Sequence, residues 1–237
     1  MLFFYIRHGD PIYNPDMLTP LGHEQAKAVA KRLCLFGIDR VFASSSNRAR
    51  QTAEPTCALL KKEMTVCEWA NEGLAWQEFT VVNENGARLW GFHHNETMEL
   101  FNSKEMRDMG ENWYNHPALH EGYKAGVERI NREVDAFMLS LGFRHDREKG
   151  SYEIVSPNNE RVALFAHQGF GMSFLSSLLD IPYPMFSTHF DTGHTGMTVI
   201  DFEERDGYAY PRMLQLANDS HLYREGILTG YHNQIKF

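Results

Sequence analysis

The N-terminal third of the chain alternates short apolar runs with longer segments of helical spacing. Leu2 to Ile6 is continuously apolar, as is typical of a strand buried on both faces. Thr19 and Pro20 predict a helix start, and Gly37 predicts its end after about Phe36. The same alternation predicts a strand at 41–43, a helix at 47–62 and a strand at 64–67. Strands that alternate with helices in this way indicate a parallel sheet.

Residues 68 to 150 interrupt this rhythm with a mostly helical, aromatic-rich segment. Its clearest helix is predicted at 122–141, where apolar residues recur at helical spacing. Further elements follow as a strand at 161–166, a helix at 169–179 and strands at 197–202 and 212–217. We therefore expect an α/β fold of three layers (α/β/α) with a mostly parallel, doubly wound sheet. Residues 1–237 would form one domain, with the helical insertion at about 68–150 as a lid or cap over the C-terminal ends of the strands.

Polar residues follow three of the predicted strands directly. The triplet Arg7-His8-Gly9 ends the first strand, the segment Ser44 to Arg48 follows the second, and His167-Gln168-Gly169 follows the strand at 161–166. In open α/β sheets ligands bind outside the carboxyl ends of the strands, so these three tips can meet in one pocket. Two histidines and two arginines directed at one point indicate phosphoryl chemistry.

The same segments carry a family resemblance. In its order of Arg7-His8-Gly9, Tyr13-Asn14, the segment 18–26, the segment 44–53 and Phe165-Ala166-His167, the chain resembles the histidine phosphatase superfamily. The resemblance is to the branch that contains cofactor-dependent phosphoglycerate mutases and fructose-2,6-bisphosphatase-like phosphatases. It covers residues 1 to about 68 and about 160 to 222. The chain departs from the pattern at Gln168, where family members usually carry glycine.

The chemistry assigns a role to each of the matched residues. A neutral imidazole can attack phosphorus, so His8 is the candidate nucleophile. Nearby Arg7 and Arg48 should depress the pKa of His8 by like-charge repulsion. Both arginines should also hold the equatorial oxygens of the transferring phosphoryl group, and His167 should donate to it. Arg50 is the alternative to Arg48, which the family pattern favours.

Two further assignments come from the resemblance. Asn14 occupies the position where relatives carry an asparagine that contacts the phosphoryl group, although an ordinary turn residue before Pro15 would look the same. The leaving alkoxide needs a proton from a carboxylic acid. Glu72 stands where relatives place this acid, and Glu78 and Asp10 are the alternatives.

Twelve histidines also raise the possibility of a metal site. The pairs with usable spacing are His93-His94, His116/His120 and His189/His194. They stand in no Cys-rich or His-Glu-x-x-His pattern, so we expect neither a metal nor another cofactor.

Composition limits the class of partner and the compartment. The net charge is −8, which argues against nucleic acid or an anionic membrane as the main partner. Three cysteines suit buried thiols in a reducing compartment better than a disulfide framework. The apolar N-terminal run is too short for a signal peptide and lacks a basic flank. We expect a cytoplasmic protein.

These observations lead to one main functional hypothesis and two rivals. The main hypothesis is a phosphomonoester hydrolase that acts through a phosphohistidine on a small phosphorylated metabolite. The nearest rival is phosphoglycerate mutase-type phosphoryl transfer, which the short loop after Asn14 disfavours. A catalytically silent phosphate-binding protein is the other. The substrate and the oligomeric state stay open.

Overall fold

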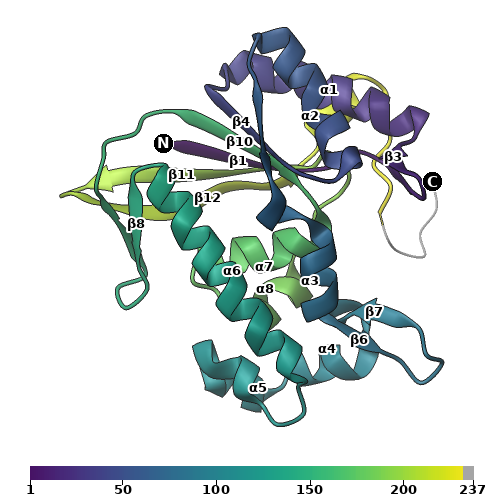
Figure 1. Ribbon diagram of the computed structural model, residues 1–237, viewed down its shortest axis with the longest axis vertical. Helices are drawn as coiled ribbons and strands as arrows, with labels where there is room; N and C mark the ends of the chain where they lie inside the picture. The colour runs from purple at the N-terminus through teal and green to yellow at the C-terminus, as the bar shows by residue number, and fades with distance from the viewer. Residues whose placement is uncertain (232–237) are drawn as a thin grey trace.

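The computed structural model describes residues 1–231, and its centre is an eight-stranded sheet (Figure 1). The strand order is β5-β4-β10-β1-β11-β12-β9-β8. The first four strands run parallel to one another: β5 (Met64–Cys67), β4 (Arg40–Ser44), β10 (Arg161–Ala166) and β1 (Leu2–Arg7). Their carboxyl ends therefore lie at one edge, as expected from the sequence.

The other half of the sheet is antiparallel, and it contains β11 (Met197–Arg205), β12 (Tyr208–Asn218), β9 (Ser151–Ile154) and β8 (Phe143–Asp146). The expectation of a mostly parallel sheet is wrong for this half. The physical reason is that β11 runs opposite to its neighbour β1 and that the chain then returns through a tight hairpin, in which Arg205 pairs with Tyr208. The loop Asp206-Gly207 has φ values of 52° and 82°, as a two-residue hairpin turn requires.

Helices cover both faces of the sheet (Figure 1). On one face lie α1 (Pro20–Phe36) and α2 (Asn47–Leu60), and on the other lie α6 (Glu121–Ser140) and α7 (Gln168–Leu178). Helix α1 begins and ends as predicted, because the side chain of Thr19 accepts from the Gly22 N–H and Gly37 takes the left-handed conformation with a φ of 70°.

The core has two parts because the side chains of β1 alternate between the faces. Phe3 and Tyr5 pack with Phe174 beneath the sheet, on the side of α6 and α7. Phe4 and Ile6 face α1 on the opposite side. All four β1 side chains are fully buried, which explains why this strand appears as an uninterrupted apolar run.

The segment between β5 and β8 holds short elements and the long helix α6. In chain order the short elements are η1 (Glu68–Ala70), α3 (Glu72–Glu78), β6 (Thr80–Val82), β7 (Arg88–Trp90), η2 (Gly91–His93), α4 (Asn95–Phe101), α5 (Lys104–Met109) and η3 (Gly110–Asn115). The two-stranded ribbon β6–β7 is absent from the sequence prediction. The C-terminal half of α6 belongs to the helical layer on the sheet, because Phe137 packs against Phe3 and Phe42.

Three small elements complete the described part of the chain. The ribbon of β2 (Pro11–Tyr13) and β3 (Asp16–Leu18) follows β1, α8 (Tyr183–His189) follows α7, and α9 (Ser220–Arg224) follows β12. The ribbon matters for function because it places residues 13 to 16 beside the first turn of α2.

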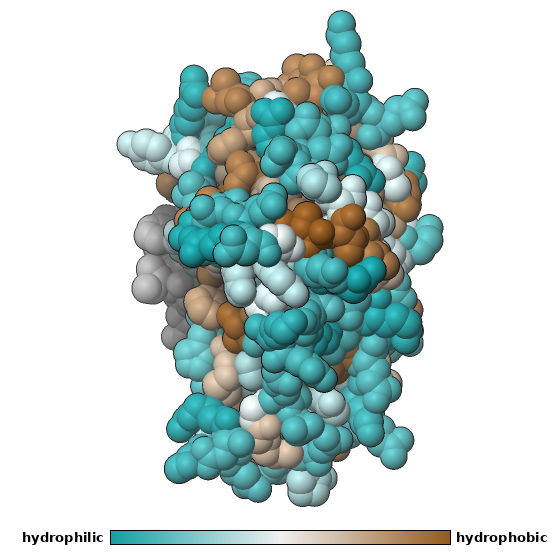
Figure 2. All heavy atoms as spheres, turned by 90° about the vertical axis from the view of Figure 1, so that its left-hand side faces the viewer, coloured by the Kyte–Doolittle hydropathy of each residue, from teal (hydrophilic) through white to brown (hydrophobic). Residues whose placement is uncertain are grey.

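The expectations from composition are met in part. The three cysteines are free, but only Cys67 is buried, whereas Cys34 and Cys57 are half-buried. Over residues 1–231, none of the helices combines the length and the apolar character that crossing a lipid bilayer requires. On the side seen in Figure 2, hydrophilic residues cover most of the surface and apolar residues form small groups.

Candidate active site

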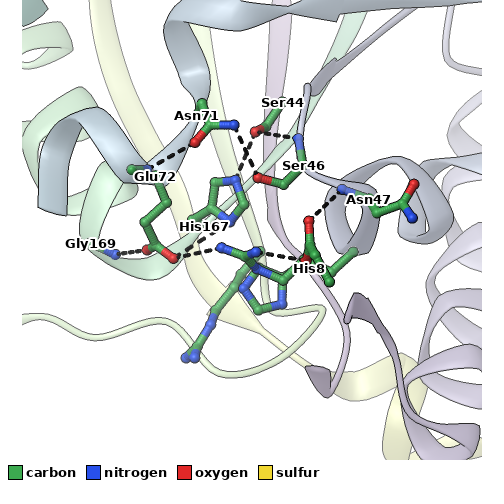
Figure 3. Close-up of polar contacts among 12 residues, drawn as sticks. His8, Ser44, Ser46, Asn47, Asn71, Glu72, His167 and Gly169 are labelled. Carbon is green, nitrogen blue, oxygen red and sulfur yellow. Dashed lines mark hydrogen bonds and ion pairs between the residues drawn. The ribbon is translucent and has the colours of Figure 1, made fainter. Parts of the chain in front are cut away.

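The ends of β1, β4 and β10 bring two histidines together at the parallel edge of the sheet (Figure 3). The rings of His8 and His167 lie 5.2 Å apart between centroids. Both side chains are buried, with 1% and 0% of the residue exposed. The convergence predicted from the strand tips is therefore present.

The protonation of His8 is set by its own loop. Nδ1 of His8 lies 2.7 Å from the carbonyl oxygen of Gly9. A carbonyl can only accept, so Nδ1 carries the proton and Nε2 keeps its lone pair. Burial lowers the pKa of His8 well below its ordinary value, and His167, Arg7 and Arg48 lower it further. The ring is held neutral, in the form a nucleophile needs.

The tautomer of His167 follows from a chain of donors. The Ser46 N–H donates to Oγ of Ser44, which lies 2.7 Å from Nε2 of His167. The Ser44 hydroxyl can then donate to Nε2, which leaves Nδ1 of His167 as a donor. Tyr5 fixes the backbone here, since its hydroxyl donates to the His167 carbonyl at 2.5 Å. Burial, followed by Arg48 and Arg7, lowers the pKa of His167 well below its ordinary value.

Both predicted arginines reach this cluster. Arg7 Nη1 donates to the Thr192 carbonyl at 2.5 Å, and Arg48 donates to Asp16 and Glu72 at 2.8 Å and 3.0 Å. Arg50 is exposed, which supports Arg48 as the site residue. Within residues 1–231, Nε of Arg7, Nε of Arg48 and Nδ1 of His167 are buried without a hydrogen-bond partner. Three unpartnered nitrogens beside a neutral histidine offer donors to the oxygens of an anion.

Of the three candidate acids, Glu72 lies in this cluster. It is the first residue of α3, where Asn71 caps the helix. One carboxylate oxygen accepts from the Gly169 N–H at 3.0 Å, and the other lies 3.7 Å from Nδ1 of His167. Glu78 instead forms two hydrogen bonds with Arg129 of α6, at 2.6 Å and 2.5 Å.

Asp10, the third candidate acid, lies beside His194. His194 was not predicted from the sequence to belong to the phosphoryl site. His194 stands 3.5 Å from the Asp10 carboxylate and 3.2 Å from Nη2 of Arg7. Its ring centroid is 5.8 Å from that of His8. His194 sits in the loop before β11, and this loop reaches the site because β11 pairs antiparallel with β1. Sequence spacing alone gives no signal for it.

Asn14 is not brought into the cluster. It is exposed, in the turn between β2 and β3. Asp16 of the same ribbon contacts the site instead, accepting from Arg48 and from the Asn47 N–H at 2.7 Å. The ring of Tyr13 also covers the Arg48 guanidinium, 5.2 Å from its centroid. The contact of Asn14 with a phosphoryl group stays a prediction, and Asp16 is the residue of this ribbon that contacts Arg48.

The histidine pairs considered for a metal do not form a cluster of ligands. His120 caps α6, His116 lies beside Glu105, and His189 contacts its own helix α8. Over the described residues, the group with ligand atoms close enough is His8, Glu72 and His167, all within 4.8 Å of one another. A metal alternative would therefore involve the phosphoryl site itself.

A pocket of about 440 Å³ opens beside Arg48 and Glu72. Its other lining residues are Tyr13, Gly73, Trp76 and Trp90. Gln168, where the chain departs from the family pattern, does not line this pocket and donates to Asp191. The site thus combines a buried anion-binding centre with an adjoining space for the rest of a ligand.

Solved structures of three phosphatases share this fold. A phosphoserine phosphatase of Entamoeba histolytica is 18% identical, with a TM-score of 0.56 over 93% of this chain and 98% of that chain. A mycobacterial glucosyl-3-phosphoglycerate phosphatase is 17% identical, with a TM-score of 0.57 over 91% and 98%. An alpha-ribazole phosphatase of Shigella flexneri is 18% identical, with a TM-score of 0.57 over 92% and 97%.

Sequence comparison, unlike the similarity of folds, identifies the family of the chain. No curated protein sequence matches the chain. The model of the histidine phosphatase superfamily (branch 1), however, matches residues 3–210. This range includes all of β1 except Leu2, the start of α2, Glu72, His167 and His194. The chain belongs to the histidine phosphatase superfamily, in branch 1.

Proposed function

We propose that the protein hydrolyses a small phosphate monoester through a phosphohistidine on His8. The observation that carries the proposal is the set of three unpartnered nitrogens, on Arg7, Arg48 and His167, around a histidine whose Nε2 is free of its proton. A phosphoryl group supplies the acceptor oxygens that these donors lack. The names of the three similar structures, all phosphatases, favour hydrolysis over mutase-type transfer.

In the first half-reaction, Nε2 of His8 attacks phosphorus. A nitrogen–phosphorus bond forms while the bond from phosphorus to the ester oxygen breaks. The carbonyl of Gly9 stabilises the positive charge that develops on the ring, because it accepts from Nδ1 at 2.7 Å. Arg7, Arg48 and His167 bind the equatorial oxygens, and their fixed positions lower the barrier.

Glu72 serves as the general acid and base. Its carboxylate accepts from Arg48 and from the Gly169 N–H. When Arg48 turns to the phosphoryl oxygens, one carboxylate oxygen is released to hold a proton for the leaving alkoxide. In the second half-reaction the carboxylate takes a proton from water, which attacks phosphorus and releases His8.

The segment at about 68–150 supplies the cap in this proposal. Helix α3 delivers Glu72 to the site, and β7 ends at Trp90 on the wall of the adjoining pocket. These residues stand where a leaving group would lie, beyond the phosphoryl centre. The cap therefore contributes both chemistry and the surface that contacts the substrate.

The test is to trap the intermediate. The purified protein is quenched in alkali during turnover of a ³²P-labelled phosphate monoester, and base-stable, acid-labile label is expected on His8. The His8→Ala variant should carry none. Phosphate binding without label or turnover would favour the silent binding protein, and transfer of label to an added phosphoglycerate would favour the mutase. Activity lost in EDTA and restored by one divalent ion would support the metal alternative.

A further inference from the structure

The pocket beside the phosphoryl site has an aromatic wall. Of its lining residues, Arg48 and Glu72 already belong to the phosphoryl centre, and Gly73 contributes backbone. The remaining surface comes from Tyr13, Trp76 and Trp90. A volume of about 440 Å³ lies in the range of small-molecule sites. The part of a substrate that leaves with the ester oxygen would occupy this space.

The tryptophans are positioned by the same elements that hold the acid. Trp76 follows Glu72 by four residues on α3, so the two side chains share one face of the helix. Trp76 and Trp90 meet edge to face, with ring centroids 4.9 Å apart. Trp90 in turn stacks on Phe92, at 5.7 Å and an interplanar angle of 10°.

A glycine places the Trp90 indole against the backbone of α7. A Cβ atom at Gly169 would overlap the six-membered ring of Trp90. The N–H of the same residue donates to Glu72 at 3.0 Å. Gly169 therefore contacts both the aromatic wall and Glu72, the group that would protonate the leaving oxygen. These contacts fix the position of the Trp90 ring relative to the Glu72 carboxylate.

The charges around the pocket disfavour a second anionic group on the substrate. Among the described residues that line it, Arg48 is the one cation, and the phosphoryl group would use it. Asp16 is bound to Arg48 at 2.8 Å, and Asp10 lies across the site beside His194. A carboxylate on the leaving group would find no partner in the lining and would approach these acids.

We infer that the preferred substrate is a phosphate ester whose leaving alcohol carries a flat, uncharged aromatic group. This inference rests on the proposed function and specifies its substrate class. The aromatic group lies against Trp76 and Trp90, with Tyr13 at the mouth, where 65% of that residue is exposed. Aromatic contacts at this wall favour a flat ring over an aliphatic group of similar size.

The first experiment compares esters whose alcohols leave with similar difficulty. Benzyl phosphate should exceed cyclohexylmethyl phosphate by about 10-fold in kcat/KM, since well-placed aromatic pairs add about this factor. Phosphoserine should be poorer still than the cyclohexylmethyl ester. Equal values for the benzyl and cyclohexylmethyl esters, or phosphoserine as the best of the three, would overturn the inference while leaving hydrolysis intact.

Variants locate the preference in the pocket. Trp76→Leu should reduce the benzyl-to-cyclohexylmethyl ratio to about 1, whereas Tyr210→Leu, at an exposed aromatic residue of β12, should keep it. Trp76→Lys adds a cation to the wall and should raise the kcat/KM of phosphoserine relative to benzyl phosphate. A ratio unchanged in both Trp76 variants would contradict the assignment.

Binding separates this inference from the proposed function. Benzylphosphonate and cyclohexylmethylphosphonate cannot be hydrolysed at their carbon–phosphorus bond, and calorimetry gives their affinities for the intact protein. Tighter binding of benzylphosphonate by about 10-fold, lost in Trp76→Leu, would support the aromatic pocket even if no ester were turned over. Turnover with equal phosphonate affinities would support the hydrolase and overturn the aromatic preference.

Discussion

The two site histidines are buried among cations, and this environment defines their chemistry. Burial disfavours the charged imidazolium, and Arg7 and Arg48 disfavour it further. An exposed histidine would be partly protonated near neutral pH and would lose its nucleophilic lone pair. The proposed nucleophile is therefore uncharged, although the arginines around it attract anions.

This environment predicts the titration of His8. In the free protein its imidazole should stay neutral as the pH falls through 6.5 and should protonate only well below, because burial and the neighbouring cations lower its pKa. NMR of ¹⁵N-labelled histidine, assigned with His8→Ala, measures this. Arg48→Ala should move the midpoint upward. A wild-type midpoint at or above 6.5 would contradict the electrostatic account.

Substitutions of Glu72 and of Arg48 should change the activity in different ways. Glu72→Gln removes the proton source but keeps the shape, so ethyl phosphate should suffer far more than p-nitrophenyl phosphate, whose leaving group needs no proton. Arg48→Ala removes a phosphoryl donor and should slow both esters together by about 10²-fold.

The kcat/KM ratio of the two esters distinguishes these roles. Glu78→Gln is the matched control, because Glu78 pairs with Arg129 outside the site. If the ratio moved in Asp10→Asn and not in Glu72→Gln, the acid would be Asp10.

At the scale of elements, helix caps and apolar runs in the sequence correctly predicted the helix ends and strands that depend on local interactions. The caps Thr19 and Gly37 bound α1 as expected, and the apolar runs of β1 and β10 are central strands. Strand pairing is non-local, so the antiparallel half of the sheet could not be deduced from apolar runs alone. Only the Asp206-Gly207 turn offered a local clue to it.

The same difference between local and non-local interactions explains which site residues could be predicted. His8 and His167 follow strands directly, so the topology of parallel strands brings them together. Asp16 and His194 arrive from a ribbon and a loop whose positions depend on pairing far along the chain. Nothing in their sequence neighbourhood marks them as neighbours of Arg48 and Arg7.

Helix α1 approaches the active-site loop closely at Gly22. A Cβ atom at Gly22 would overlap the Asp10 carbonyl oxygen, and Gly22 also closely approaches Gly9. Gly22→Ala should therefore displace residues 9–10 and lower both the melting temperature and kcat/KM. Lys27→Ala, at an exposed position of the same helix, should change neither measurably. Unchanged activity in Gly22→Ala would show that the loop tolerates the displacement.

At the scale of the molecule, a half-buried charged network joins helices α6 and α7 to the edge of the sheet. His145 of β8 lies between Asp135 of α6 and Asp180 after α7, at 2.9 Å and 2.8 Å. Arg147 also donates to both carboxylates. The imidazole stacks on Tyr152 of β9, with ring centroids 4.1 Å apart. One histidine thus connects two helices with the edge of the sheet.

This network predicts how stability depends on pH. Burial lowers the pKa of His145, but its hydrogen bonds to Asp135 and Asp180 outweigh this and raise it above 6.5. The stabilisation is therefore complete below pH 6.5 and is lost as the pH rises through the folded-state pKa. Urea unfolding from pH 5.5 to 9 measures it. The stability difference between wild type and His145→Gln should shrink with rising pH, and a difference independent of pH would refute the charged state.

The ion pairs of Asp16 and Glu72 with Arg48 have a consequence for turnover. Asp16 and Glu72 are counter-ions of Arg48, so a phosphate ester that binds the Arg48 guanidinium must compete with two carboxylates. This competition weakens the binding of any anion, including the inorganic phosphate that the proposed hydrolysis would release. The two carboxylates that compete with the substrate for Arg48 would also help to displace the phosphate product. Their ion pairs with Arg48 would then form again after each turnover.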